Sequence, residues 1–260
     1  MTDTGGALPI SLAERAARNE RWVVLTALAL ATAAGLFATL EVGGMLMLPT
    51  APDVGAIAYG LALFLMWWSM MLAMMLPSAA PAILTYGAMR RKFLSQGRAQ
   101  PPLLAFVSGY GAIWTAFSLA AVTMQIASRD VIALTGMMAA ASAAIGGVLL
   151  AAAGIYQLTP LKQACLRKCQ TPLFFFARNW REGAAGALRM GLSHGLYCLG
   201  CCWVLMLLLF YGGVMEAAWI VGLALYVAAE KLIPAKFALS RFAGIILIVW
   251  GGATLFGALS

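Results

Sequence analysis

The sequence predicts an all-α protein, a polytopic bundle of about seven transmembrane helices. Of its 260 residues, 63% are hydrophobic and only 10% are charged, and the mean hydropathy is +0.91. This composition is typical of integral membrane proteins rather than soluble ones. The apolar runs are roughly 20 to 28 residues long, whereas membrane-spanning strands are about ten residues long and alternate in polarity. We therefore expect helices to cross the bilayer.

Residues 1–21 are expected to be a cytoplasmic N-terminal segment, and residues 22–260 a single transmembrane helical domain. The N-terminal segment carries Arg15, Arg18 and Arg21. We interpret it as a positively charged anchor, although its second half could form a short amphipathic helix on the membrane surface. The predicted spans are 22–47, 57–86, 102–128, 131–158, 186–211, 216–233 and 241–259.

Three local features interrupt these spans. Pro77 and Pro81 are expected to kink the inner half of the second span, and residues 128–130 to form a tight turn. Residues 159–185 predict a basic cytoplasmic loop. Its PLFFFARNW portion is too short to cross the bilayer, so we expect it at the interface, with Trp180 and the Phe cluster at headgroup depth.

The basic residues predict the orientation of the spans. With the N-terminus inside, all of the 17 Lys and Arg residues except Arg129 fall at or near cytoplasmic ends. We therefore predict that the C-terminus is outside, in a bacterial inner membrane. The net charge of +8 does not indicate a nucleic-acid partner, because the basic residues lie in short loops and form no separate domain. The lipid bilayer is the expected partner.

The fifth span combines membrane length with unusual chemistry. It contains the only histidine of the chain, His194, and three of the five cysteines, Cys198, Cys201 and Cys202. On a helix these cysteines lie about 40°, 20° and 80° from His194, so imidazole and thiols share one face. Soft or borderline metals such as Cu(I) and Zn prefer these ligands, and polar groups inside a membrane span indicate function.

One straight helix cannot bring all four groups to one metal ion. A rise of about 1.5 Å per residue separates His194 from Cys202 by about 12 Å along the axis. Either neighbouring helices complete a site, or the face carries successive sites. The alternative is packing, because free cysteine behaves as a small buried hydrophobe and histidine can bond to a neighbouring helix. The odd cysteine count argues against a disulfide framework, so we expect mostly free thiols or thiolate ligands.

The second span supplies a further soft face. Met66, Met70 and Met74 recur every four residues. Thioethers suit Cu(I) and are poor ligands for zinc, although methionine is also a flexible packing residue. Counted from the cytoplasmic ends, Met74 and His194 lie at similar depth, so the two soft faces could meet.

Other candidates lie nearer the ends of the spans. Glu41, near the outer end of the first span, could capture cations or could simply be hydrated. Cys165 and Cys169 form a C-x3-C pair on the predicted cytoplasmic loop, and at this spacing on a helical turn both could accept or donate a soft ion. Glu230 and Lys231 are expected to be an interfacial pair rather than a proton relay.

Several segments resemble a known family. YQLTPLKQACLRKCQTP and ALRMGLSHGLYCLGCCWVLMLLLFYGGVM, with WWSMMLAMMLP upstream and AEKLIP downstream, are similar to the bacterial predicted metal-binding integral membrane proteins. The resemblance covers the second to sixth spans and implies metal binding. Members often have histidine just before the second loop cysteine, where this chain has Lys168, and that departure weakens the loop as a metal site. The motif positions here are Cys165, Cys169, His194, Cys198, Cys201 and Cys202.

These observations predict a membrane protein that binds, transfers or transports Cu(I) and that could deliver it to a soluble or membrane metalloprotein. Zinc is the second choice, because Cys and His also suit it. Two alternatives stay open: a thiol–disulfide oxidoreductase using Cys198 and Cys201, and a non-transporting subunit or assembly factor of a membrane metalloenzyme. No catalytic residue is assigned, since no phosphate loop, nucleotide fingerprint or hydrolase triad is visible.

Overall fold

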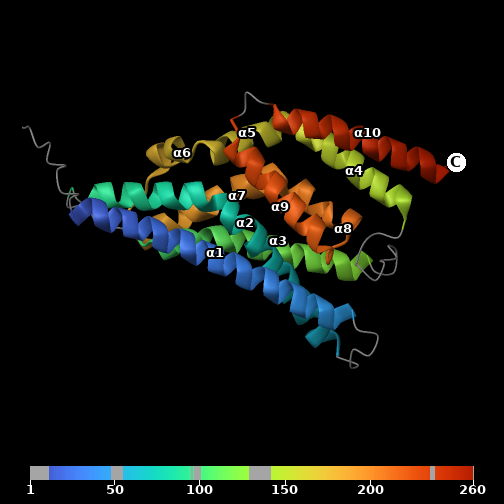
Figure 1. The fold of residues 1–260 in the computed structure, drawn as a ribbon, viewed down its shortest axis with the longest axis horizontal. Coiled ribbons are helices and arrows are strands. Elements are labelled where there is room, and N and C mark those ends of the chain that lie inside the picture. The colour runs from blue at the N-terminus through green and yellow to red at the C-terminus, as the bar shows by residue number, and fades with distance from the viewer. Residues whose placement is uncertain are drawn as a thin grey trace, which may run out of the picture.

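The protein is a bundle of helices (Figure 1), as predicted. The computed structural model describes residues 12–47, 55–94, 96, 101–128, 142–234 and 238–259, and within them helix is the only regular secondary structure. The predicted tight turn falls mostly outside these residues, as does the first part of the predicted fourth span. The helices are α1 (Leu12–Met47), α2 (Ala56–Leu94), α3 (Leu103–Ser128), α4 (Ala143–Leu158), α5 (Pro160–Gln170), α6 (Pro172–Asn179), α7 (Gly183–Leu207), α8 (Leu209–Gly212), α9 (Ala217–Leu232) and α10 (Leu239–Leu259).

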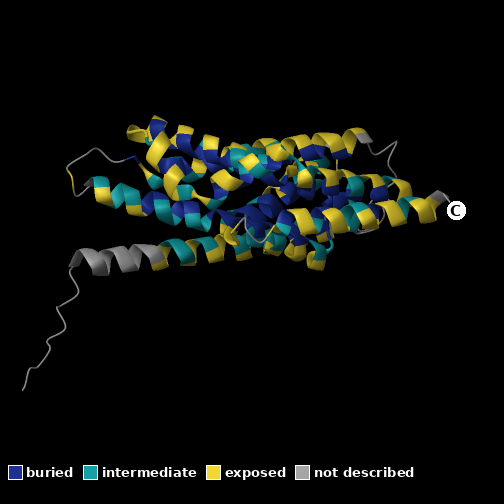
Figure 2. Ribbon diagram, turned by 90° about the horizontal axis from the view of Figure 1, so that it is seen from above, coloured by how far each residue is buried: buried dark blue, intermediate teal, exposed yellow. Residues whose placement is uncertain are grey.

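The core lies where α2, α3, α7 and α9 meet. α3 packs against both α2 and α7, α1 covers α2, α5 packs on α7, and α10 pairs with α4. Figure 2 shows the buried residues gathered in the middle of the bundle and exposed residues on its outward faces. Large apolar side chains are among those exposed, such as Phe37, Leu104 and Phe256. Apolar outward faces are what a bilayer requires of helices that contact lipid.

Glycine allows the closest helix contacts. A Cβ atom added to Gly191 of α7 would lie 2.0 Å from the Phe106 carbonyl oxygen, and one added to Gly109 of α3 would lie 2.3 Å from the Leu188 carbonyl oxygen. Apolar surface provides no net attraction between helices in lipid, so close backbone packing at small residues takes over that role. These two glycines hold α3 against α7, the helix with the histidine and three cysteines.

Buried polar contacts fix the neighbours of α2. The Thr39 and Ser69 hydroxyls lie 2.9 Å apart and join α1 to α2, while Trp67 Nε1 donates to Gln125 Oε1 of α3 at 2.7 Å. Pro77 and Pro81 lie inside α2, which remains one helix and changes direction about midway along its length (Figure 1). The bend agrees with the predicted kink, since an internal proline removes a backbone hydrogen bond.

Within the described residues, five helices are long and apolar enough to cross a membrane, and the count rises to six if α4 and α5, bent by 66°, form one broken span. α9 has 16 residues, about 24 Å at 1.5 Å per residue, which is short for a hydrocarbon core of about 30 Å. The number of seven spans and their orientation therefore stay predictions.

The segment 159–185, expected to be a loop, contains two helices. Thr159 caps α5 by accepting a hydrogen bond from the Lys162 backbone N–H at 3.3 Å, and Pro160 occupies the first helical position, where its missing N–H is harmless. In α6 the Phe cluster divides, because Phe174 is exposed and the two phenylalanines that follow it are buried. The segment therefore packs into the protein and does not lie wholly at the interface.

Helix α1 begins at Leu12, so the second half of the predicted N-terminal segment is helical.

We expect Gly109→Ala to destabilise the bundle by about 1–3 kcal/mol, because the new methyl group meets backbone atoms that cannot move aside. Gly111→Ala on the same helix is the control, since its new methyl group would have nothing within 4 Å. Thermal unfolding of the purified proteins measures both. Equal unfolding temperatures for the two variants would contradict the close contact between α3 and α7.

Candidate metal centre

The predicted metal ligands of α7 are all buried, and its cysteines form no disulfide. The four predicted residues are between 1% and 3% exposed, and all five cysteines of the chain are free. This agrees with the expectation of free thiols or thiolate ligands. α7 holds these groups inside the bundle, where water does not compete for them: His194, Cys198, Cys201 and Cys202.

Cys198 is the meeting point of four helices. Lys231 Nζ of α9 donates to Cys198 Sγ at 3.0 Å and to Ser78 Oγ of α2 at 2.7 Å. The Tyr110 hydroxyl of α3 lies 3.1 Å from Cys198 Sγ and 3.0 Å from the Met75 carbonyl oxygen. One thiol thus has a cationic and a phenolic neighbour, and both neighbours also contact α2.

A second group of sulfur contacts joins α7 to α5. The Cys169 thiol of α5 lies near that of Cys201, and the Cys202 thiol lies near those of Cys198 and Cys201. Cys201 Sγ and Cys202 Sγ also donate to the Cys198 carbonyl oxygen, at 3.1 and 3.0 Å. Four thiols from two helices therefore lie near one another in pairs, and we call this group the thiol cluster: Cys169, Cys198, Cys201 and Cys202.

Cys165 lies beside this cluster, one turn before Cys169. A Cβ atom added to Gly200 of α7 would be 2.8 Å from Cys165 Sγ, so a side chain at position 200 would clash with this thiol. The Tyr156 hydroxyl of α4 donates to the Gly200 carbonyl oxygen. The C-x3-C pair is therefore on a helix that packs against α7, and not on a free loop.

His194 lies one turn from Cys198, inside a ring of aromatic side chains. Its ring centroid is 5.5 Å from that of Phe175, 6.0 Å from Tyr110, 6.1 Å from Phe106 and 6.4 Å from Phe176. Its Nδ1 atom is buried and has no hydrogen-bond partner among the described residues. Buried polar atoms are usually satisfied, so an unpartnered ring nitrogen is a candidate ligand atom.

The predicted methionines are buried in the core, but α2 contacts Tyr110 and Lys231, the two neighbours of Cys198, further along its length, through the Met75 carbonyl and through Ser78. Glu41 is exposed on α1 and belongs to no contact of the thiol cluster. The methionines of the predicted set are Met66, Met70 and Met74.

The expected interfacial pair of Glu230 and Lys231 does not exist. Both side chains are buried, at 2% and 7% exposed, and each has another partner. Glu230 forms an ion pair with Lys162 of α5 at 2.7 Å and accepts a hydrogen bond from the Tyr226 hydroxyl at 2.6 Å. The side-chain amide of Gln170 donates to the Glu230 carbonyl oxygen at 2.8 Å, so α5 and α9 are joined twice.

The sequence did not predict that Lys162, Glu230 and Lys231 are buried or that Tyr110 contacts Cys198. The segment AEKLIP places a charged pair at the end of an apolar run, and this pattern is equally typical of a buried pair and of an interfacial anchor. Nothing in the sequence indicated that Lys162 would turn inward from the basic segment.

Within the described residues, no three or more His, Cys, Asp and Glu side chains form a ready-made metal site. The thiols instead approach in pairs. Structural zinc sites have four ligands, and thiolates are soft ligands that bind Cu(I) as well as zinc.

A family described as PpoB2, copper chaperone, matches residues 64–254, from within α2 to within α10. The chain belongs to the PpoB2 copper chaperone family. Comparisons with curated proteins and with solved structures gave no match. Family membership supports the predicted similarity to metal-binding proteins and relates it to copper. The matched residues include every cysteine and the histidine of this PpoB2-family protein.

We expect Lys162→Met to destabilise this PpoB2-family protein by about 3–5 kcal/mol, because it leaves Glu230 buried and uncompensated. Lys162→Met combined with Glu230→Gln should recover much of the loss, since no unpaired charge then stays inside. Thermal unfolding measures both, with Lys168→Met, an exposed lysine on the same helix, as the control. A loss equal to that of the control would show that the buried pair does not stabilise the fold.

Proposed function

We propose that this PpoB2-family protein binds Cu(I) at the thiol cluster between α5 and α7 and passes it to a partner metalloprotein. The observation that carries the proposal is the contact between Cys169 and Cys201, two free thiols from different helices. Membership of a copper chaperone family supports copper as the cargo. Two thiolates from separate helices can share an ion that one helix alone could not enclose.

The environment of the cluster suits a soft, singly charged ion. Lys231 donates to Cys198 Sγ, and a buried ammonium group needs an anionic or strongly polar partner, so this contact favours the thiolate that binds metals. The cluster is almost fully buried, which excludes the water and carboxylate ligands that harder ions prefer. Copper in its reduced state fits this combination better than zinc.

Neighbouring groups could carry the ion to or from the cluster. His194 offers an unpartnered ring nitrogen one turn from Cys198. The methionines of α2 offer neutral thioethers, which bind Cu(I) and can release it. We infer that these groups form a path, with Glu41 near its outer end and with Cys165 and Cys169 at its inner end.

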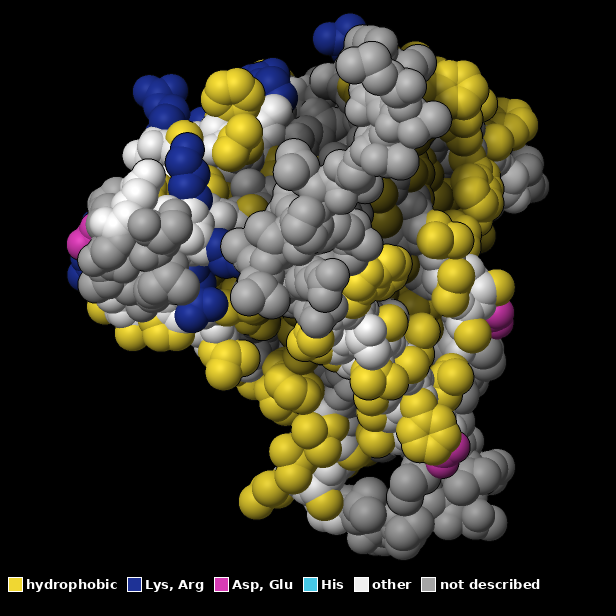
Figure 3. All heavy atoms as spheres, turned by 60° about the vertical axis from the view of Figure 1, so that its left-hand side comes forward, with side chains coloured by type: hydrophobic (Ala, Val, Ile, Leu, Met, Phe, Trp, Pro, Cys, Tyr) yellow, Lys and Arg dark blue, Asp and Glu magenta, His cyan; other side chains and the backbone are white. Residues whose placement is uncertain are grey.

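We place the protein in a bacterial inner membrane, with seven spans and the N-terminus inside. The support comes from the long apolar helices and from the surface. Figure 3 shows hydrophobic side chains over much of the described part of one face, and Lys and Arg side chains gathered toward the upper left of that face. Basic residues collect at the cytoplasmic boundary of membrane proteins.

The first test is metal analysis of protein purified under reducing conditions after growth with copper and zinc. We expect near-stoichiometric copper in the wild type and little in Cys169→Ser/Cys201→Ser, because each helix then loses its thiol at the shared position. Lys168→Ser, an exposed position on the same helix, is the control and should keep its copper.

Zinc in place of copper would overturn the choice of metal. Absence of any metal, together with a Cys198–Cys201 disulfide after mild oxidation, would overturn the proposal and favour a thiol–disulfide oxidoreductase.

A second test concerns the methionines. Replacing Met66, Met70 and Met74 together by Leu keeps their approximate volume and removes their sulfur atoms. We expect the variant to fold and to keep its copper at the thiol cluster, but to exchange it several-fold more slowly with a Cu(I) chelator. The control is Met124→Leu, which changes an exposed methionine. Unchanged exchange would show that the methionines only fill the core.

A further inference from the structure

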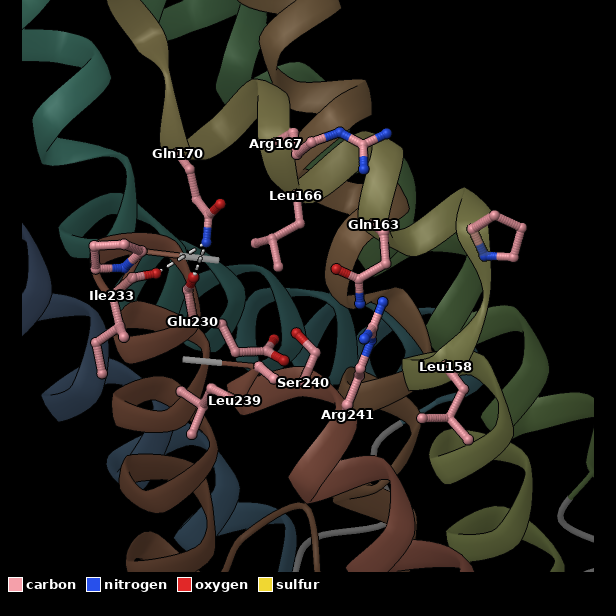
Figure 4. Close-up of a pocket in the computed structure, with 13 residues that line it drawn as sticks. Leu158, Gln163, Leu166, Arg167, Gln170, Glu230, Ile233, Leu239, Ser240 and Arg241 are labelled. Atoms are coloured by element: carbon pink, nitrogen blue, oxygen red, sulfur yellow. Dashed lines mark hydrogen bonds between the residues drawn. The ribbon is translucent and has the colours of Figure 1, made fainter. Parts of the chain in front are cut away.

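A cavity of about 570 Å³ opens where the end of α5 meets the end of α9 and the start of α10. The predicted topology puts all three of these ends at the cytoplasmic side. The polar part of its lining includes two arginines, two glutamines and a serine. Figure 4 shows Arg241 reaching from α10 toward Gln163 of α5, with Arg167 one turn further along that helix.

The cavity carries unbalanced positive charge. No described carboxylate forms an ion pair with Arg167 or Arg241. Among the described residues of the lining, Glu230 is the only acidic one; its charge is balanced by Lys162, and it also accepts a hydrogen bond from the Tyr226 hydroxyl. Two guanidinium groups with no ion-pair partner among the described residues, beside amide and hydroxyl donors, suit a phosphate group, which arginine binds with paired N–H donors.

An apolar groove adjoins the charged cavity. It is about 440 Å³ in volume and is lined by Leu232, Ile233, Pro234 and Leu239, of which the last three also line the cavity. A charged cavity continuous with an apolar groove matches a molecule with an anionic head and a hydrocarbon chain. A free anion would occupy only the charged cavity and leave the apolar groove empty.

We propose that this site binds an anionic phospholipid, with the headgroup phosphate between Arg167 and Arg241 and an acyl chain along the groove. Basic pockets between helices at the cytoplasmic side are known settings for such headgroups. The inference rests on the membrane placement proposed above and not on copper binding.

A bound lipid would brace the part of the fold beside the thiol cluster. Gln170, which lines the cavity, donates to the carbonyl oxygens of Glu230 and Ile233 (Figure 4), and Gln170 directly follows Cys169. Glu230 directly precedes Lys231. The lipid would therefore stabilise the junction of α5 and α9 that presents Cys169 and Lys231 to α7.

The test uses the full-length protein in detergent and compares phosphatidylglycerol, phosphatidylcholine and inorganic phosphate. We expect phosphatidylglycerol alone to raise the unfolding temperature and to be retained in native mass spectra. Arg167→Gln/Arg241→Gln should lose both effects. Arg178→Gln/Arg189→Gln removes the same charge from exposed positions outside the cavity and should keep them. If the double variant does not fold, Arg167→Gln and Arg241→Gln are measured singly, and each should weaken retention.

Four results would overturn the proposal: equal stabilisation by phosphatidylcholine, an effect that survives the loss of both arginines, an effect lost equally in the control, or the full effect from inorganic phosphate alone. Copper content is measured on the same samples. Arg167→Gln/Arg241→Gln should still bind copper, so failure of the lipid site and failure of the copper site are distinguishable.

Discussion

The contact of Lys231 with Cys198 and Ser78 is the constraint on which the centre of this structure depends. An ammonium group buried in an apolar bundle is costly unless it is surrounded by polar or anionic partners. Lys231 finds those partners on α7 and α2, and Tyr110 of α3 completes the group. Four helices are therefore held at one level by groups that cannot separate without leaving a buried charge unpaired.

A second buried charge determines where α5 lies. Lys162 comes at the start of this helix and reaches Glu230, while Gln170 at its end reaches the backbone of α9. With both ends attached, the helix must present Cys169 to α7. The acidic residue that orients α5 and the basic residue that contacts Cys198 are neighbours in α9, so the two halves of the thiol cluster are aligned by one short stretch of chain.

The sequence could predict the fold class and the chemistry of single faces, and it could not predict which faces meet. Composition and run length suffice for an all-α bundle, because a bilayer excludes most other structures. The shared face of the α7 cysteines follows from helical periodicity. The approach of Cys169 to Cys201 depends on Lys162 turning inward, and a lysine in a basic segment reads as surface charge. Glu230 and Lys231 were predicted to be an interfacial pair for the same reason, since the local sequence pattern does not show whether the end of a helix is buried inside the bundle.

The arrangement also suits a protein that must release its cargo. Cys201 belongs to α7, a helix of 25 residues packed on several neighbours, whereas Cys169 belongs to α5, which has 11 residues and follows a 66° bend after α4. Under the proposed function, an ion shared between them would be held on one side by the long α7 and on the other by the short α5, whose two ends are attached to the chain around α9. Partner thiolates could then replace the ligands one at a time.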